Sequence, residues 1–374
     1  MEKEVNVDNT YKQDFEHILS LITEARNRVY SKANSELVLL YFNVGKVVSD
    51  RVSTGKWGEN IVQQLSDFIL SKAPNLSGFN RRGLYRMKQF FEVYSDNQFL
   101  SSLSTLLKNY ENQQDTKVST VLTQLQSADD LPSKFVSTVL SQIQWSSHLH
   151  ILNKTKTAEE KIFYVLHAIS QRLSVRELER QLNTATFERT MLSNKLVSAM
   201  PTQLPENLFK DPYIFEFLDL PDGHSEKDLE KAITLNLQKF ILEVGKDFTY
   251  MGEQYRIQAG NRDFRTDLLF YHRELNCLVL FELKIQEFDP EFLGKLNFYL
   301  GALDKDVKKP HENPSIGILL CKGKDTEVVE ISMSRHISPA IVADYETKLI
   351  DKKLLANKLH QLGKVLDKPN EQDV

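Results

Sequence analysis

Along the first half of the chain, apolar residues recur every three or four positions, which is the spacing of helices that bury one face. The pattern covers residues 11 to about 95, for example in FEHILSLITEARNRVY and ENIVQQLSDFILSKA, with Gly and Asn between the segments. It predicts several helices of ordinary length. The pattern resumes in TAEEKIFYVLHAISQRL and VRELERQLNTATFERTML and ends near residues 200–215, where two prolines and polar residues indicate a domain boundary.

The second half of the chain has a different texture. It predicts one helix over EKDLEKAITLNLQKFILEVG, a second over EFLGKLNFYLGALDKDV and a strand over SIGILLC. Runs rich in β-forming residues predict three more strands, at 255–258, 264–272 and 277–285. The combination indicates a mixed α/β domain.

Two other stretches complete the domain plan. One is rich in Ser, Thr, Gln and Asn and predicts a spacer with loose helices, whereas the last 28 residues predict a charged helix and a polar tail. The expected domains are a helical region at 1–95, the spacer at 96–140, a helical continuation at 141–205, the α/β domain at 206–346 and the terminal helix and tail at 347–374.

Composition limits the class of protein. With 374 residues, 41% apolar and 10% aromatic, the chain can form several packed cores. A net charge of −4 does not suggest nucleic-acid binding on average, although a local basic face can be hidden in the sum. The two cysteines, Cys277 and Cys321, exclude a disulfide framework and a Cys-rich zinc site, so we expect a reducing, cytoplasmic location. No basic apolar leader and no run of about 18 apolar residues occurs, so we expect no membrane attachment.

Charged residues interrupt the two apolar strands of RTDLLFYHRELNCLVLFELKI. If RELN forms the hairpin loop, Asp267 of the first strand lies opposite Glu282 of the second, with Lys284 on the same face. Carboxylates opposed at roughly 5 Å between Cβ atoms are destabilising unless a positive charge lies between them, and Mg²⁺ suits such oxygen ligands. The alternative is a solvated edge hairpin in which Lys284 neutralises one acid, but the apolar neighbours favour a central pair covered by helices.

The spacing from Asp267 to Glu282-Leu283-Lys284 resembles the PD-(D/E)XK nuclease signature, although Thr266 stands where the proline would be. More specifically, RTDLLFYHRELNCLVLFELKI, FLGKLNFYLGALD and NPSIGILLCKGKD are similar to the YhcG-like family of nucleases. GFNRRGLYRMKQFFEVY, KWGENIVQQLS and SVRELERQL resemble the N-terminal region of that family. The resemblance covers most of the chain except the spacer and the tail.

The resemblance implies an α+β, restriction-endonuclease-like domain with a mixed central sheet flanked by helices. It implies Mg²⁺, or Mn²⁺ in its place, held by Asp267, Glu282 and the Leu283 carbonyl. Lys284 would position the attacking water or the phosphate, and Lys295 would face the scissile phosphate.

In such nucleases a helical glutamate often completes the metal site, and two glutamates of the expected helix after residue 225 are candidates. Glu230 and Glu243 are 13 residues apart on a helix that rises 1.5 Å per residue, so both cannot serve one small site. We expect Glu230. The alternative for either residue is a carboxylate on a helix surface.

A basic helix is expected over residues 77–94, with apolar residues on its other side. Most protein contacts to nucleic acid go from Arg and Lys to phosphates, so this helix is a candidate for binding, and QRLSVRELER offers a second basic turn. The candidate residues are Arg81, Arg82, Arg86, Lys88, Arg176 and Arg180. The alternative is an ordinary solvated helix face. His148 and His150 lack a third metal ligand near them in sequence, so we expect packed or surface histidines.

These observations predict an endonuclease that hydrolyses phosphodiester bonds, with DNA as the expected substrate. The rival prediction is a DNA- or protein-binding component that keeps the nuclease fold without cutting. RNA stays open as a substrate because no base-reading or stacking motif is recognisable. The oligomeric state is open as well, a homo-oligomer included.

Overall fold

The computed structural model describes residues 12–110, 131–198 and 204–366, apart from positions 56, 58, 205, 206, 260, 335 and 337. The chain divides into two compact units, Met1–Glu179 and Arg180–Val374, which we call the helical unit and the sheet unit. None of the described helices is both long enough and apolar enough to cross a membrane.

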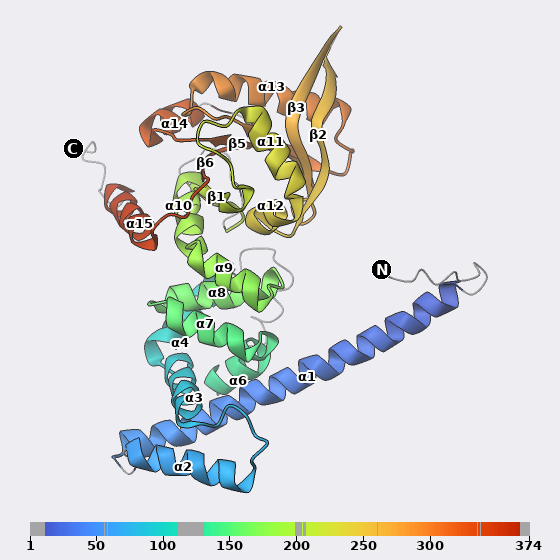
Figure 1. Ribbon diagram of the computed structural model, residues 1–374. Coiled ribbons are helices and arrows are strands. Elements are labelled where there is room, and N and C mark those ends of the chain that lie inside the picture. Colours follow the sequence, from blue (N-terminus) through green and yellow to red (C-terminus); the bar gives the residue numbers. More distant parts are fainter. Residues whose placement is uncertain are drawn as a thin grey trace. The chain divides into compact units, whose positions relative to one another are not determined.

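All the regular elements in the described residues of the helical unit are helices, joined by loops (Figure 1). Its elements are α1 (Lys12–Ser53), α2 (Glu59–Lys72), α3 (Arg81–Tyr94), α4 (Asn97–Tyr110), α6 (Leu131–Thr138), η1 (Leu140–Gln142), α7 (Trp145–Lys154), α8 (Ala158–Ser170) and α9 (Val175–Asn183), which extends past the unit boundary.

Helix α1 is far longer than the helices of ordinary length that the pattern predicted. Its 42 residues contain no proline, and the first glycine is Gly45. That glycine allows close packing instead of ending the helix, because a Cβ there would lie 2.1 Å from the carbonyl oxygen of Met87 in α3. Asn34 does not break the helix either, since its side chain donates to the carbonyls of Ser141 and Ile143.

An aromatic core joins α1, α3 and α7 in the helical unit. The ring of Phe90 packs edge-on against those of Phe42, Trp145 and His148. His148 is fully buried against the Leu140 carbonyl, and burial lowers its pKa to about 4, so it is a packed histidine, as expected.

The ends of the expected spacer belong to this core. Phe99 and Leu103 of α4 and Phe135 of α6 are buried, and Phe99 packs against both Tyr94 and Phe135. The rest of the spacer, residues 111–130, lies outside the described residues.

The sheet unit contains one six-stranded sheet in the order β1-β6-β5-β4-β3-β2. Strands β4, β5, β6 and β1 are parallel, whereas β2 and β3 extend the sheet in antiparallel fashion. The elements are α10 (Thr186–Ser198), β1 (Tyr213–Ile214), η2 (Glu216–Leu218), α11 (Glu226–Leu235), α12 (Leu237–Val244), β2 (Phe248–Ala259), β3 (Arg262–His272), β4 (Cys277–Leu283), α13 (Pro290–Asp306), β5 (Asn313–Cys321), α14 (Thr326–Met333), β6 (Ala340–Glu346) and α15 (Lys352–Leu366).

Two sequence predictions need correction here. The single helix expected from residue 226 is two helices, because Asn236 leaves the helical conformation (φ −112°, ψ 29°) and its side chain donates back to the Ala232 carbonyl. Strand β2 is also three times longer than the expected run 255–258, since pairing with β3 extends it toward α12.

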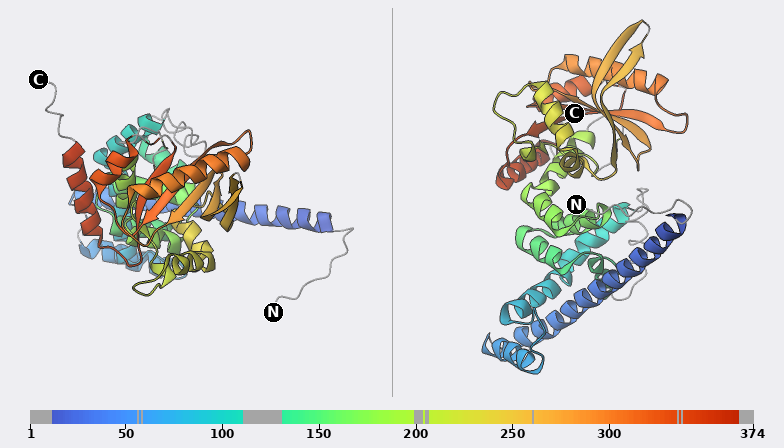
Figure 2. Two further views of the ribbon diagram at one scale, coloured as in Figure 1. Left: turned by 90° about the horizontal axis from the view of Figure 1, so that it is seen from above. Right: turned by 45° about the vertical axis from the view of Figure 1, so that its right-hand side comes forward.

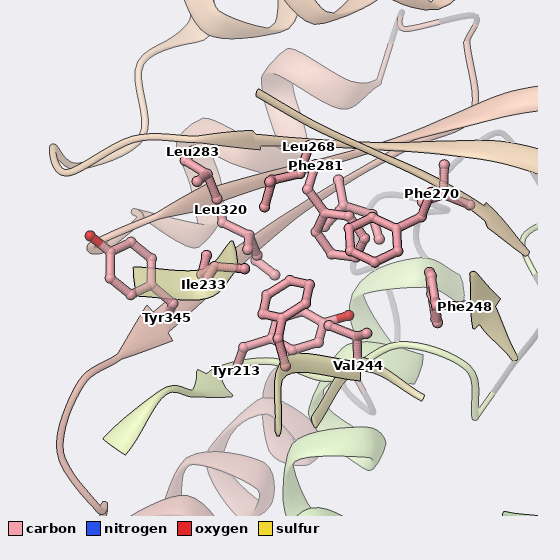
Figure 3. Packing of buried hydrophobic residues seen from close by; sticks show 14 of the residues in the cluster. Tyr213, Ile233, Val244, Phe248, Leu268, Phe270, Phe281, Leu283, Leu320 and Tyr345 are labelled. Carbon is pink, nitrogen blue, oxygen red and sulfur yellow. The ribbon is translucent and has the colours of Figure 1, made fainter. Parts of the chain in front are cut away.

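Helices cover both faces of the sheet, as Figures 1 and 2 show. Leu229, Ile233, Phe240 and Val244 of α11 and α12 pack on one face, where they meet Phe270, Phe281 and Tyr345 (Figure 3). Helices α13 and α14 pack on the other face. On that face α13 comes so close to β5 that a Cβ on Gly317 would lie 2.8 Å from Leu296. The mixed sheet flanked by helices is the α+β architecture that the sequence predicted.

Candidate active site

Asp267 and Glu282 lie on neighbouring antiparallel strands. His272 pairs with Cys277 and Leu268 with Phe281, as expected from the four-residue loop, and this register brings Asp267 beside Glu282. Leu269 lies two residues after Asp267, and Leu280 lies two residues before Glu282. Both leucines pack beneath α13, and side chains two apart on a strand share a face. The two carboxylates therefore belong to the α13 face, near one end of the pair of strands.

The carboxylate of Asp267 is held by the neighbouring strand. Its Oδ2 accepts a hydrogen bond of 2.8 Å from the main-chain N–H of Leu283. Burial, and then the charge of Glu282, raise the pKa of Asp267 to about 6. The pair therefore has more negative charge than its surroundings accommodate easily.

Glu282 is fully buried and is contacted by two lysines. Its Oε1 accepts from Lys295 Nζ at 2.5 Å and from Lys284 Nζ at 3.2 Å. Its Oε2 is buried and has no hydrogen-bond partner among the described residues. An acceptor left in this state is costly unless a cation or a donor reaches it.

Lys284 follows directly after β4 and is positioned by the sheet. Its main-chain N–H donates to the Leu320 carbonyl of β5 at 2.8 Å, and its Nζ donates to the Leu283 carbonyl at 2.7 Å. The Nζ also lies 5.7 Å from the ring centre of Phe292, at the start of α13. Lys284 is therefore nearly buried and constrained on several sides.

Lys295 reaches the same carboxylate from α13. Its side chain is 48% exposed, and its Nζ lies 5.3 Å from the ring centre of Tyr299. Burial works against the charge of Lys295, but the hydrogen bond and the charge of Glu282 raise its pKa above the ordinary value. This lysine connects the buried carboxylate to solvent.

The structure adds a residue that the sequence analysis missed. Glu226 begins α11, and its Oε2 lies 3.5 Å from Lys284 Nζ. A capping box of Ser225 and Asp228 sets the start of this helix. The four residues SEKD could have pointed to Glu226, because a capping box marks the first turn of a helix and Glu226 is an acid within that turn.

The two glutamates considered from the sequence lie elsewhere. Glu230 Oε1 accepts from the side chain of Gln254 on β2 at 2.7 Å, one turn beyond Glu226 on α11. The expectation that Glu230 joins the cluster therefore finds no support in its contacts.

Glu243 is fully buried in a separate ion cluster at the end of α12. It accepts from Arg189, from Arg180 at 2.8 Å and from the N–H of Ile214 at 3.0 Å, while Lys210 donates to its carbonyl. Burial opposes its charge, but the surrounding cations lower its pKa to about 2. This glutamate holds α10, α12 and β1 together.

The donor set fits a hard divalent cation. It offers the carboxylate of Asp267, the carboxylate of Glu282, whose Oε2 has no partner among the described residues, and the main-chain carbonyl of Leu283. Such oxygens are the ligands of Mg²⁺. No group of three His, Cys, Asp or Glu side chains suited to a metal gathers within the residues that the structure describes. The protein ligands would therefore be two carboxylates and a carbonyl.

The basic residues expected on α3 fall into two groups. Lys88 is paired with Glu92 at 2.7 Å, and Arg81 lies over the ring of Tyr85 at 5.8 Å. Arg82 is exposed and Arg86 half-buried, and neither has an ion pair in the part of the chain that the structure describes. The charges of these two arginines are therefore not neutralised by a carboxylate within the described residues.

The second basic turn is only partly available. Arg176 is exposed, whereas the guanidinium of Arg180 is engaged by Glu243, by Glu216 at 2.9 Å and by the Ile214 carbonyl. Arg180 is therefore a structural residue and not the phosphate contact expected from the sequence, because two carboxylates already neutralise it.

The chain is similar to known proteins over most of its length. Residues 206–360 match the family model of the YhcG PDDEXK nuclease domain, and residues 17–189 match that of the DUF1016 N-terminal domain. The sequence is 30% identical over an alignment of 370 residues to the protein named "Putative nuclease YhcG" in Escherichia coli (strain K12), and the match covers 96% of each chain. No solved structure matches the chain significantly.

Proposed function

Because the chain belongs to the YhcG family of PDDEXK nucleases over nearly its whole length, we propose that it is a Mg²⁺-dependent nuclease that hydrolyses phosphodiester bonds in DNA. The observation that supports this most directly is the buried pair of Asp267 and Glu282 with Lys284 and Lys295 around it. Buried like charges are maintained in a protein at a cost, which is typical of a functional site.

Asp267, Glu282 and the Leu283 carbonyl would hold the cation, with Mn²⁺ able to replace Mg²⁺. When bound, it would neutralise charge that develops on the phosphate and make a water molecule a better nucleophile. The raised pKa of Asp267 and the unpartnered Glu282 oxygen are the features of this chain that such a cation would relieve.

Lys284 supplies a compact positive charge with three donors. Its place beside Glu282 lets it orient the attacking water or stabilise charge on the phosphate, while the Glu226 carboxylate holds the ammonium from the other side. Lys295, at the open side of the site, contacts the scissile phosphate in this proposal. Glu226 thus supports Lys284, whereas the metal ligand that the sequence analysis expected in Glu230 has no counterpart in this proposal.

Helix α3 of the helical unit would hold the nucleic acid through Arg82 and Arg86, with Arg176 as a further phosphate contact. The two cysteines are buried free thiols, which suits a protein that works in the reducing cytoplasm.

The test is cleavage by the full chain. Linear, branched and single-stranded DNA and RNA are incubated with the parent and with Asp267→Asn, in Mg²⁺, Mn²⁺ or EDTA. We expect the parent to cut DNA only with metal and Asp267→Asn to bind without cutting. Activity in EDTA, or equal activity of the two proteins, contradicts the assignment. Binding without cleavage under every metal favours the rival function, a DNA-binding component that keeps the nuclease fold.

A further inference from the structure

Helix α1 carries two apolar faces, of which the helical unit covers one. The covered face includes Val38, Phe42 and Val48, which are buried, and Gly45, where α3 approaches most closely. This contact holds the second half of α1 against α3.

The second face is an apolar stripe along the opposite side of α1, which we call the α1 seam. Its members recur at steps of three and four and, at 3.6 residues per turn, fall within a sector of about 120°. They are Ile18, Ile22, Ala25, Val29, Ala33, Leu37, Leu40, Val44 and Val47, of which Val44 is half-buried against the core of the helical unit. Arg26, Glu36 and Asn43 interrupt the stripe within the same sector.

Most of the α1 seam is exposed. The exposed fractions are 52% for Ile18, 51% for Ile22, 68% for Val29, 45% for Leu40 and 54% for Val47. A largely apolar exposed surface of this kind in a protein marks an interaction site.

No described residue of the helical unit covers the first half of α1. Every residue from Ile18 to Ala33 whose burial is described is exposed. An isolated helix of about 16 residues is marginal in water, particularly when it bears an unpaired apolar stripe. A partner that covers the seam would stabilise this half.

We propose that the partner is a second copy of this chain, whose α1 lies antiparallel to the first with Ala33 facing Ala33. Measured from Ala33, the seam is nearly the same in both directions, so Val29 meets Leu37, Ile22 meets Val44 and Ile18 meets Val47. Such self-complementarity is what a two-fold interface requires.

Two observations select the antiparallel direction. It places the unsupported half of each α1 on the half of the other that α3 already holds, whereas a parallel pair would join the two unsupported halves. A parallel pair in register would also bring Arg26, which lies within the seam, next to its own copy, which like charges oppose. The antiparallel pair instead places Arg26 about one helical turn from Glu36 of the other copy.

The seam is long for a contact between two helices. It offers nine apolar residues per copy over the 30 positions from Ile18 to Val47, about 44 Å at 1.5 Å per residue. An antiparallel pair would therefore remove two such rows of apolar side chains from water at once.

The oligomeric state of the full chain, measured by sedimentation equilibrium, is the first test. We expect a dimer for the parent, and for Ile22→Glu/Val29→Glu a dissociation constant weaker by about 100-fold or more, because two charges per copy would enter the apolar seam. Ser20→Glu/Ser31→Glu is the matched control, since it adds the same charges to the same helix away from the seam. A parent that stays monomeric, or a seam variant that dimerises like the control, overturns the proposal.

Disulfide trapping tests the direction, and the native cysteines do not interfere because both are buried. We expect Ala33→Cys to form a covalent dimer on mild oxidation and Ile18→Cys to remain monomeric. Ile18→Cys/Val47→Cys should again form one, because bonding needs Cα atoms within about 7 Å. Covalent dimerisation of Ile18→Cys alone, or none by Ala33→Cys, overturns the antiparallel arrangement.

Discussion

Replacing Asp267 by Asn should stabilise the metal-free protein and at the same time abolish its response to metal. Asn keeps an oxygen that accepts from the Leu283 N–H, so the local hydrogen bond survives. It removes one of the two carboxylate charges, which are held together at a cost when no cation is present.

The size of this effect follows from the pKa of Asp267, which burial and Glu282 raise from 3.8 to about 6. At ~1.4 kcal/mol per tenfold change in proton affinity, ionising Asp267 costs the folded state about 3 kcal/mol. Since the side chain is partly exposed, water reduces the cost to about 1–2 kcal/mol. That corresponds to a rise in Tm of about 2–6 °C for a unit of this size.

The sign of the pH dependence also follows. Between pH 4 and pH 6 the folded protein binds a proton at Asp267 that the unfolded chain releases, so the metal-free parent loses stability as the pH rises through this window. Above pH 6 the full cost is present. Asp267→Asn lacks this term, so its advantage over the parent should vanish near pH 4.

Scanning calorimetry in EDTA at pH 4, 5 and 7, repeated at pH 7 with Mg²⁺, measures both effects. Both tryptophans, Trp57 and Trp145, lie in the helical unit, so tryptophan fluorescence would not report unfolding of the sheet unit. Hydrogen exchange of the β3 and β4 amides should therefore accompany the calorimetry. Mg²⁺ at 100 times its dissociation constant should stabilise the parent by about 2.7 kcal/mol and leave the variant unchanged.

Asp263→Asn serves as the control, because Asp263 lies on the same strand but is exposed and paired with Arg256. It should change neither the EDTA melt nor the Mg²⁺ response appreciably. If Asp267→Asn is less stable than the parent at pH 7 in EDTA, or if Mg²⁺ stabilises both proteins equally, the like-charge account of this site is wrong.

Three further predictions concern the other charged groups. Lys284→Ala should lower the cleavage rate about 10²–10³-fold, while Mg²⁺ binding measured by calorimetry persists because both carboxylates stay intact. Lys322→Ala is the exposed control, and equal cleavage rates of the two variants would make Lys284 a charge partner only. Arg82→Ala/Arg86→Ala should weaken binding to all DNA sequences alike and reduce the slope of log affinity against log salt concentration by about two. Fluorescence anisotropy at several salt concentrations measures this slope, and an unchanged slope would leave α3 a structural element. Glu243→Gln should destabilise the sheet unit by about 3–5 kcal/mol in urea unfolding because it leaves buried cations uncompensated. Since the pKa of Glu243 is lowered to about 2, the stability that Glu243 contributes in the parent should be present above pH 4.5 and lost as the pH falls toward 2.

The register of the β3–β4 hairpin shows where local sequence is sufficient. Alternation of side chains and a four-residue loop determine which residues face each other, so the neighbours Asp267 and Glu282 followed from counting alone. The same holds for Lys284, which lies two positions after Glu282. It also holds for the layered architecture, because strand and helix periods are local properties.

The choice of the glutamate near Lys284 was beyond such counting. Glu226 and Glu230 lie one turn apart on α11, and which of them approaches the site depends on how the helix packs over the sheet. The break at Asn236 likewise moved Glu243 onto a second helix, where Arg180 and Arg189 bury it.

By itself, then, the sequence determined the elements with strong periodicity, the pairing of the two acidic strands and the chemistry of their charges, because these depend on neighbours along the chain or across one short loop. Only the tertiary structure decided which charges meet across elements. Lys295 and Glu226 reach the site from α13 and α11, and Arg180 is withdrawn into a buried ion cluster. The reason is that packing of helices onto the sheet sets these distances, and no spacing along the chain encodes them.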